Sequence, residues 1–364
     1  MKPLCSAATI FIAVSLFCAT PSNAATPADF AQWQQLITDT TKALRANQLP
    51  DAIHLCEQAL TLSTTFGPTN TAYSRTQVLR AEVYLWENKK DLAEQTFKQA
   101  VASCEKAAGT NSVEVVHPLS SLANFYYFVT RQYDRVTPIF ERILNIVQAD
   151  PKRTDRDVIM WSRNLGMIYQ QTGNYAKAEP MFKRAVALAE KDAEWFPHEL
   201  LNAADFYRAW GKYDQAETLA QRALAIREKA MTADNSDSQL DTAVCLNGLG
   251  AIYLSWNKPD KAEAAYRRSL EITRKFMSAD EADLIPALQG LASALQAQRQ
   301  LEQAAPLYQR ALIIAEKNSG PNDPQVATLL ANYATVLKGM GKADDAKRML
   351  DRADSIRQQT TRTE

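Results

Sequence analysis

The sequence LGMIYQQTGNYAKAEPMFKRAVALAEK, residues 165–191, decides the fold. Small and large residues alternate in it at helical spacing: Gly166 and Ala178 are small, whereas Tyr169 is large. Small side chains allow two helices to cross closely, and large ones fill the space beside the crossing. Gly173 lies between the two helical stretches and suits a tight turn, because glycine adopts backbone angles that other residues resist. The stretch therefore predicts a helical hairpin.

The small residue at Ala178 recurs along the chain at spacings of 41, 43, 42, 38, 46, 42 and 42 residues. The eight marker positions are Ala52, Ala93, Val136, Ala178, Ala216, Ala262, Ala304 and Ala346. A single hairpin of this kind cannot bury its apolar face alone, so its copies must stack. The spacing therefore predicts an all-α solenoid of about eight helix-turn-helix hairpins.

The tetratricopeptide signature, L-G-x2-Y…A-x3-F, is matched by Leu165, Gly166, Tyr169, Ala178 and Phe182. The chain thus resembles the tetratricopeptide repeat family over residues 30–358. The phrases RALAIREKAM from Arg222 and RALIIAEKNSGPNDPQ from Arg310 resemble the kinesin-light-chain-type subgroup of these repeats. A period of about 42 residues, rather than the usual ~34, implies longer helices or longer loops between repeats. The resemblance implies a right-handed superhelical solenoid whose first helices line a concave groove.

The third repeat departs from this pattern. Its segment SLANFYYFVTRQYDR, from Ser121, places Tyr126 one residue further from its marker Val136 than Tyr169 lies from Ala178. The segment fits the repeat only if one extra residue lies in the turn around Thr130.

Residues 1–24 are expected to be a signal peptide. Lys2 precedes an apolar run from Thr9 to Ala19, and small residues lead to a cleavage site after Ala24. We expect export to the periplasm or the extracellular space; a lipoprotein acylated at Cys18 is the alternative. The repeats then fill residues 25–364, with predicted boundaries at 30–70, 71–112, 113–152, 153–195, 196–235, 236–280, 281–322 and 323–358.

Composition and motifs give no indication of catalysis. The chain of 364 residues has 41 basic and 41 acidic side chains, so bulk charge predicts neither a nucleic acid nor an anionic membrane surface as partner. His54, His117 and His198 fall in different repeats, and no metalloprotease, nucleophile-elbow or phosphate-loop motif occurs. After signal cleavage three cysteines remain, at spacings that fit buried apolar positions better than a disulfide framework. We expect no enzymatic activity, no metal and no cofactor, and the oligomeric state stays open.

The binding residues are expected on one face of the first helices, at positions 2, 5, 6, 9, 12 and 13 of each repeat. By resemblance to the family, this face lines the groove. The candidates are Arg163, Asn164, Met167, Gln170, Asn202, Asp205, Arg208, Asn247 and Asn332. An asparagine side chain both donates and accepts hydrogen bonds, so it can pair with any peptide backbone. The alternative is that these asparagines join neighbouring repeats or face water.

Aromatic residues occupy the same face in the N-terminal repeats. Trp86 and Tyr127 are either anchors for a partner, since aromatic residues are enriched in interface hot spots, or packing residues. The sequence thus predicts an exported scaffold or adaptor that binds a protein or an extended peptide in its groove. A peptide-responsive sensor that changes shape on binding is the alternative, and an enzyme is not expected.

Overall fold

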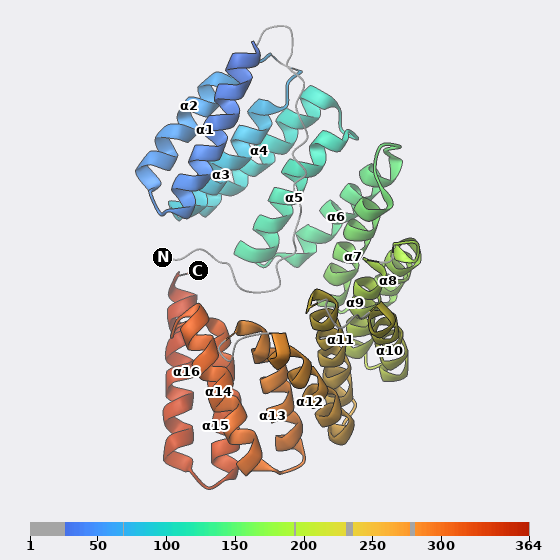
Figure 1. The fold of residues 1–364 in the computed structure, drawn as a ribbon. Helices are drawn as coiled ribbons and strands as arrows, with labels where there is room; N and C mark the ends of the chain where they lie inside the picture. Colours follow the sequence, from blue (N-terminus) through green and yellow to red (C-terminus); the bar gives the residue numbers. More distant parts are fainter. Residues whose placement is uncertain (1–25, 68, 193, 231–235, 277–280, 364) are drawn as a thin grey trace. The chain divides into compact units, whose positions relative to one another are not determined.

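The computed structural model describes residues 26–363, apart from residues 68, 193, 231–235 and 277–280. All regular secondary structure in this part of the chain is helical (Figure 1). The predicted signal peptide, residues 1–24, and its cleavage site lie outside the described residues.

The helices pair into eight hairpins of a first and a second helix, which confirms the predicted fold class and number of hairpins. The pairs are α1 (Pro27–Arg45) with α2 (Leu49–Thr64), α3 (Ala72–Trp86) with α4 (Lys90–Ala108), α5 (Val116–Asn124) with α6 (Tyr133–Ala149), α7 (Asp155–Gln171) with α8 (Tyr175–Ala189), α9 (Phe196–Ala209) with α10 (Tyr213–Ala230), α11 (Ser236–Ser255) with α12 (Pro259–Phe276), α13 (Ile285–Ala297) with α14 (Leu301–Ser319), and α15 (Pro324–Gly339) with α16 (Ala343–Thr363). Many of these helices have 15 to 19 residues, which accounts for the long repeat period.

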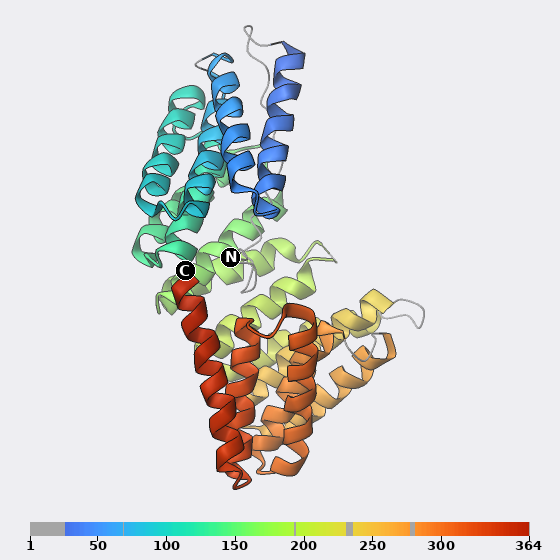
Figure 2. The same cartoon turned by 90° about the vertical axis from the view of Figure 1, so that its left-hand side faces the viewer.

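The hairpins are grouped in two compact units. The N-terminal unit ends at Met181 and the C-terminal unit begins at Phe182, inside α8. Within each unit every second helix packs on the first helix of the next hairpin, as α2 does on α3 and α10 on α11. First helices also pack on one another, α1 on α3 and α9 on α11, so each unit is a continuous stack (Figures 1 and 2).

The marker residues lie at the helix crossings. Ala52, Ala178 and Ala262 are 0% exposed, and Ala346 in the last hairpin is 4% exposed. Large rings fill the space beside them: within the C-terminal unit the Phe182 ring stacks on an aromatic ring of α9. Dense packing of small and large side chains at each helix crossing explains why the small–large pattern repeats along the chain.

Each hairpin turn contains one residue in the left-handed backbone conformation. These residues are Asn47, Asn88, Arg131, Gly173, Gly211, Asn257, Arg299 and Gly341, with φ between 55° and 78°. A backbone hydrogen bond closes every turn; in the fourth hairpin the Asn174 N–H donates to the Tyr169 carbonyl at 2.7 Å. Only three of the eight positions are glycine, because asparagine tolerates this conformation and the closing bond stabilises it elsewhere.

The extra residue of the third repeat lies around Thr130, as predicted, and takes the form of a π-helical turn closed by the Thr130 N–H on the Phe125 carbonyl at 3.2 Å. Helix α5 continues into a π-helical turn, η2 (Phe125–Val129). The Gln132 N–H closes the following turn on the Tyr126 carbonyl at 2.8 Å, one residue further along the chain than in the other hairpins. A π-turn absorbs one inserted residue without ending the helix.

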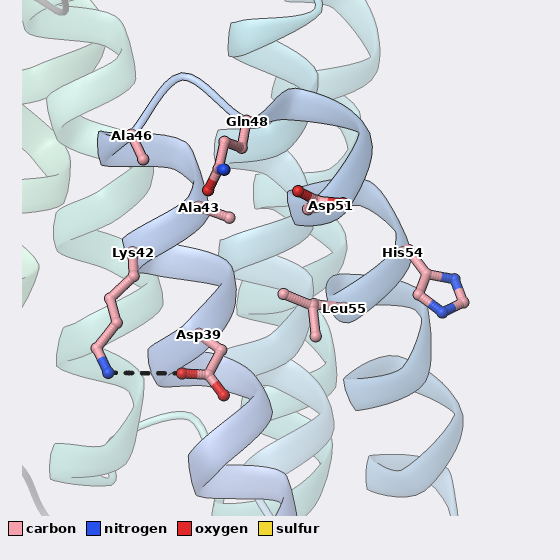
Figure 3. Close-up of a pocket in the computed structure, with 8 residues that line it drawn as sticks. All are labelled: Asp39, Lys42, Ala43, Ala46, Gln48, Asp51, His54 and Leu55. Atoms are coloured by element: carbon pink, nitrogen blue, oxygen red, sulfur yellow. Dashed lines mark ion pairs between the residues drawn. The ribbon is translucent and has the colours of Figure 1, made fainter.

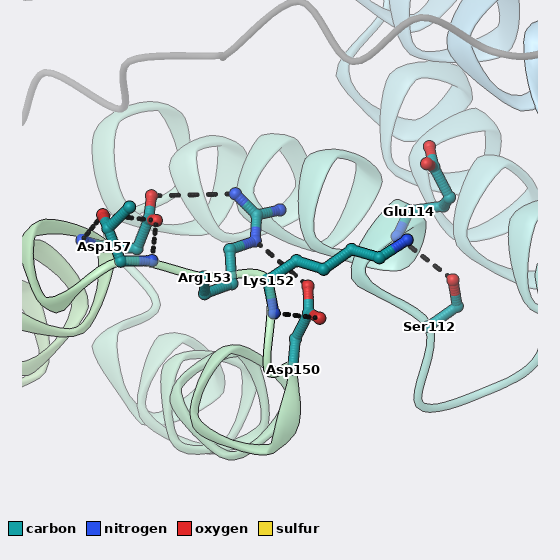
Figure 4. Close-up of polar contacts among 7 residues, drawn as sticks. Ser112, Glu114, Asp150, Lys152, Arg153 and Asp157 are labelled. Carbon is teal, nitrogen blue, oxygen red and sulfur yellow. Dashed lines mark hydrogen bonds and ion pairs between the residues drawn. The ribbon is translucent and has the colours of Figure 1, made fainter.

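Helix α7 begins at a capping box. The Thr154 hydroxyl accepts from the Asp157 N–H at 3.4 Å, and the Asp157 carboxylate accepts from the Thr154 N–H at 2.9 Å. The Arg153 guanidinium lies 3.7 Å from both Asp150 and Asp157 (Figure 4). Satisfied backbone groups and a carboxylate in the first turn stabilise a helix N-terminus, so this loop determines where α7 starts.

Candidate ligand-binding face of the first helices

We call the positions 2, 5, 6, 9, 12 and 13 of the first helices the inner face. On this face Arg208 of α9 connects two neighbouring repeats. Its Nε and Nη2 donate to Asp205 Oδ1 at 2.9 and 2.7 Å, and its Nη1 donates to Ser255 Oγ, at the end of α11, at 3.2 Å. The Asp205 side chain is 59% exposed. An exposed ion pair contributes little to stability, so its main consequence is to place fixed polar groups at the surface.

The four predicted asparagines differ in exposure. Asn202, Asn247 and Asn332 are half-buried, whereas Asn164 is 2% exposed. The Nδ2 of Asn164 and the Oδ1 of Asn247 are buried and have no hydrogen-bond partner among the described residues. A ligand therefore reaches Asn164, or the Oδ1 atom of Asn247, only if the surroundings move. The amides of Asn202 and Asn332 are half-buried and have no such buried, unpaired atom.

The predicted residues are divided between the two units. Arg163, Met167 and Gln170 are half-buried on α7 of the N-terminal unit. Asp205, Arg208 and the three half-buried asparagines belong to the C-terminal unit. Within this set, a direct contact joins Asp205 and Arg208. The inner face of the C-terminal unit is thus the part whose predicted polar residues are both exposed and interconnected.

The two aromatic candidates make packing contacts. Trp86 packs against the buried cluster that contains Leu44, Cys56 and Val83. The Tyr127 ring lies 5.2 Å from the Tyr133 ring of its own hairpin, measured between centroids. These contacts correspond to the packing alternative: Trp86 packs on residues of the first hairpin and of its own helix, and Tyr127 packs within its own hairpin.

Two tyrosines of the second helices, each four residues past a marker alanine, also reach the first helices. Tyr308 of α14 lies with its hydroxyl 2.8 Å from Ser293 Oγ and 3.3 Å from Gln296 Oε1, both on α13. Tyr266 of α12 lies between Gly250 of α11 and Gly290 of α13. The signal that could have revealed Tyr266 is the pair of glycines inside two successive first helices.

Tyrosines at the signature position also form hydrogen bonds between neighbouring hairpins. The Tyr126 hydroxyl donates to Glu94 at 2.9 Å, the Tyr253 hydroxyl donates to Glu217 at 2.7 Å, and Tyr169 donates to Glu141 in the same way. Burial, and then the bond to Glu217, raises the pKa of Tyr253. These bonds were not predicted, although Glu94 and Glu217 each follow a marker alanine directly.

Aromatic side chains and lysines cover the turns of the fifth and sixth hairpins. Lys212 Nζ lies 3.3 Å from the centroid of the Trp210 ring, and Lys258 Nζ lies 2.9 Å from that of Trp256. The Tyr213 ring stacks on Trp256 at 5.8 Å and so joins the two hairpins. Cation–π and stacking contacts of this kind stabilise the turns.

An open hollow lies between α1 and α2, and Asp39, Lys42 and His54 are among its lining residues (Figure 3). Asp39 and Lys42 form an ion pair at 3.5 Å, whereas His54 points away from them (Figure 3). None of the predicted binding residues lines this hollow. The arrangement offers no nucleophile beside a base, so it does not indicate a reaction.

The cysteines and acidic residues do not form a reactive or metal-binding centre in the described part of the chain. Cys56, Cys104 and Cys245 are buried free thiols. Burial raises the pKa of Cys56 and of Cys104 to about 11 and that of Cys245 to about 12, which disfavours the reactive thiolate. Among the described residues, no three His, Cys, Asp or Glu side chains are placed to hold a metal ion.

Stacked helical hairpins with small residues at the crossings and polar residues on the first helices define a repeat protein of the interaction class. A family model described as tetratricopeptide repeat matches residues 115–191, 199–275 and 284–359, well over half of the chain. The chain belongs to the tetratricopeptide repeat family, as its signature predicted. Proteins of this family bind protein partners, and their fold is typically a scaffold for such interactions.

Solved structures with the same fold include three with TM-scores above 0.5. BtubC (BKLC) from P. vanneervenii is 22% identical, with a TM-score of 0.52, over 63% of this chain and 92% of its own. A tetratricopeptide repeat protein from Parabacteroides merdae is 16% identical, with a TM-score of 0.53, over 83% and 99%. The apo form of RapI is 10% identical, with a TM-score of 0.54, over 91% and 98%. At these identities the similarity shows the fold alone.

No curated protein matches the chain significantly. Among the described helices, none combines the length and the apolar character needed to cross a membrane.

Proposed function

We propose that this protein is an exported adaptor that binds a protein, through an extended peptide segment, on the inner face of its C-terminal unit. The observation that carries the proposal is the Asp205–Arg208–Ser255 connection, which holds a carboxylate and a guanidinium at the surface across two adjacent first helices. The half-buried side chains of Asn202 and Asn247 lie on the same first helices, α9 and α11. Fixed groups that both donate and accept are suited to an extended main chain.

Export is supported by the signal-like residues 1–24, with acylation at Cys18 as the alternative form of the same route. The absence of an enzymatic role is also part of the proposal. Its support is the chemistry of the Asp205–Arg208–Ser255 series: the group beside the Ser255 hydroxyl is a guanidinium, which stays protonated and cannot act as a general base.

The division of the described chain into two compact units favours a second candidate function, a sensor that changes shape when a peptide binds. A ligand that binds to a chain of two separately packed units can change how compact the whole chain is. Small-angle X-ray scattering distinguishes the two candidates: the radius of gyration changes with ligand for a sensor and stays constant for a static adaptor.

A photo-cross-linking residue tests the proposed binding face. We expect p-benzoylphenylalanine in place of Asp205 to form adducts with a partner protein in intact cells, and cell fractionation to find these adducts in the exported fraction. The same residue in place of His54, which is exposed on the second helix α2, is the matched control and should form few or none. Equal adducts from both positions, or none from Asp205, would contradict the binding face.

A further inference from the structure

A recurring ion pair joins the second helices of neighbouring hairpins. It connects the residue twelve positions after one marker with the residue six positions after the next marker. Four such pairs of glutamate and arginine have N···O distances between 2.5 and 2.9 Å: Glu105–Arg142, Glu190–Arg222, Glu228–Arg268 and Glu316–Arg352. The arginine at this position is thus bound by a carboxylate wherever the preceding hairpin supplies one.

The same two positions carry two positive charges between the sixth and seventh hairpins. Arg274 of α12 takes the place of the glutamate, and Arg310 of α14 is the usual arginine. Partial burial, and then the charge of Arg310, lowers the pKa of Arg274, as expected for two neighbouring cations. Among the described residues no carboxylate forms an ion pair with Arg274. Two cations therefore meet where the four other pairs hold one cation and one anion.

An exposed apolar side chain lies beside the two arginines. Ile313 follows Arg310 by three residues, so the two side chains are neighbours on the surface of α14. Ile313 is 56% exposed, the highest value among the large apolar side chains in the described part of the chain. The equivalent residues of the other hairpins are small or polar: Thr61, Ala102, Asn145, Ala187, Ala225, Glu271 and Ser355. Packing within the repeat therefore does not require an isoleucine at this position.

We propose that Arg274, Arg310 and Ile313 form a docking surface for an acidic segment of a partner protein. A carboxylate of the partner takes the place that glutamate has in the four ion pairs and neutralises both guanidinium groups, which bind carboxylates in a fixed geometry. An apolar side chain next to that carboxylate packs on Ile313. This surface belongs to the second helices, so it is separate from the inner face and does not depend on it.

A protein segment fits this surface better than a membrane does. The four equivalent ion pairs show that each such position accepts a single carboxylate. Ile313 is one apolar side chain, whereas a helix that binds a membrane buries a whole apolar face. The 41 basic and 41 acidic residues of the chain also provide no general attraction to anionic lipids.

Arg274→Glu tests the surface, because it gives Arg310 the carboxylate that the four equivalent arginines have. We expect the melting midpoint to rise by about 1–2 °C, since a contact between like charges becomes an exposed ion pair. A display library of twelve-residue peptides is first bound to the full chain and then depleted on the Arg274→Glu chain. The peptides that remain should carry Asp or Glu beside an apolar residue, and should bind the variant about tenfold more weakly than the original chain.

Two further variants serve as a second test and a matched control. Ile313→Ser should weaken the same peptides by about fivefold, because it removes the apolar contact. Lys229→Glu, at an exposed residue of α10, makes the same change of charge away from the surface and should leave the affinity unchanged. If no peptide survives the depletion, or if the surviving peptides are not acidic, the inference is overturned.

Other occupants of the surface would give different results. Vesicles of equal parts phosphatidylglycerol and phosphatidylcholine that bind the original chain but not Arg274→Glu would assign the surface to a membrane. A dimer in sedimentation equilibrium that Arg274→Glu abolishes would assign it to a second copy of the chain. Either outcome overturns the inference. Cross-linking from Asp205 reports on the inner face separately, so its failure would contradict the proposed function and leave this inference standing.

Discussion

At the scale of single residues, two glycines show how this repeat tolerates a large side chain between its first helices. The Tyr266 ring occupies the space that a Cβ would need at Gly250 and at Gly290. At Gly248, two residues earlier on α11, an added Cβ would meet a leucine methyl group at an ordinary 3.5 Å. Gly250 and Gly290 are therefore required by the Tyr266 ring, whereas Gly248 is not.

We expect Gly290→Ala to lower the free energy of unfolding by about 1–3 kcal/mol, because the new methyl group overlaps the Tyr266 ring. Gly248→Ala should be neutral or should raise it by about 0.5–1 kcal/mol, since alanine favours a helix where space allows. Urea unfolding followed by circular dichroism measures both. In a Tyr266→Leu background the penalty of Gly290→Ala should shrink; an undiminished penalty would show that the ring is not its cause.

At the scale of the helical elements, the closure of the hairpin turns is more constant than the residues that form it. The turn at Arg299 has the same left-handed backbone as the turn at Gly341, with φ of 62° and 78°. The third hairpin keeps this closure by converting its inserted residue into the π-turn η2. The third hairpin therefore accommodates its inserted residue in a π-turn and keeps the backbone hydrogen bond that closes the hairpin turn.

Deletion of Phe128, an exposed residue of η2, should be tolerated, because it lets the π-turn return to a regular α-helical turn. We expect the melting midpoint to change by only a few degrees. Deletion of Gln170, near the equivalent end of α7, removes a residue that the regular turn needs and should lower the midpoint much more. Thermal unfolding followed by circular dichroism compares the melting midpoints of the two deletion variants. Equal decreases would show that η2 does not contain the inserted residue.

At the scale of the whole molecule, stability should depend on pH through one half-buried histidine, whose Nδ1 atom is buried without a hydrogen-bond partner among the described residues. Burial, and then the charge of Arg75, lowers the pKa of His117 to about 4. In the unfolded chain this imidazole titrates near 6.5, so the unfolded state binds the proton first as the pH falls. The stabilising contribution is complete above pH 6.5 and is lost as the pH decreases towards 4.

Between pH 7 and pH 5 we therefore expect His117 to account for a loss of roughly 1–2 kcal/mol in the free energy of unfolding. His117→Gln should lose correspondingly less over this interval, as measured by urea unfolding at each pH. His54→Gln, at an exposed histidine, is the matched control and should follow the original chain. An identical pH dependence for all three proteins would show that His117 stays solvated in the fold.

The number of hairpins, the place of their turns and the family follow from the amino-acid sequence, because they depend on helical spacing within each repeat and on the spacing of the marker residues. Ala178, Tyr169 and Gly173 are sufficient to define one hairpin, and the marker spacing defines the others. The inner-face positions also follow from this spacing, which is sufficient to place Asp205 and Arg208 on that face.

The tertiary structure alone decided how exposed these positions are and which bonds they lack. Asn164 and Asn202 share one position in the repeat, yet Asn164 is nearly inaccessible, because neighbouring hairpins and not its own helix determine what covers it. The Tyr266 ring lies between Gly250 and Gly290, a contact that depends on two first helices from different repeats. Spacing along one helix predicts a face, whereas what covers that face depends on side chains of neighbouring repeats.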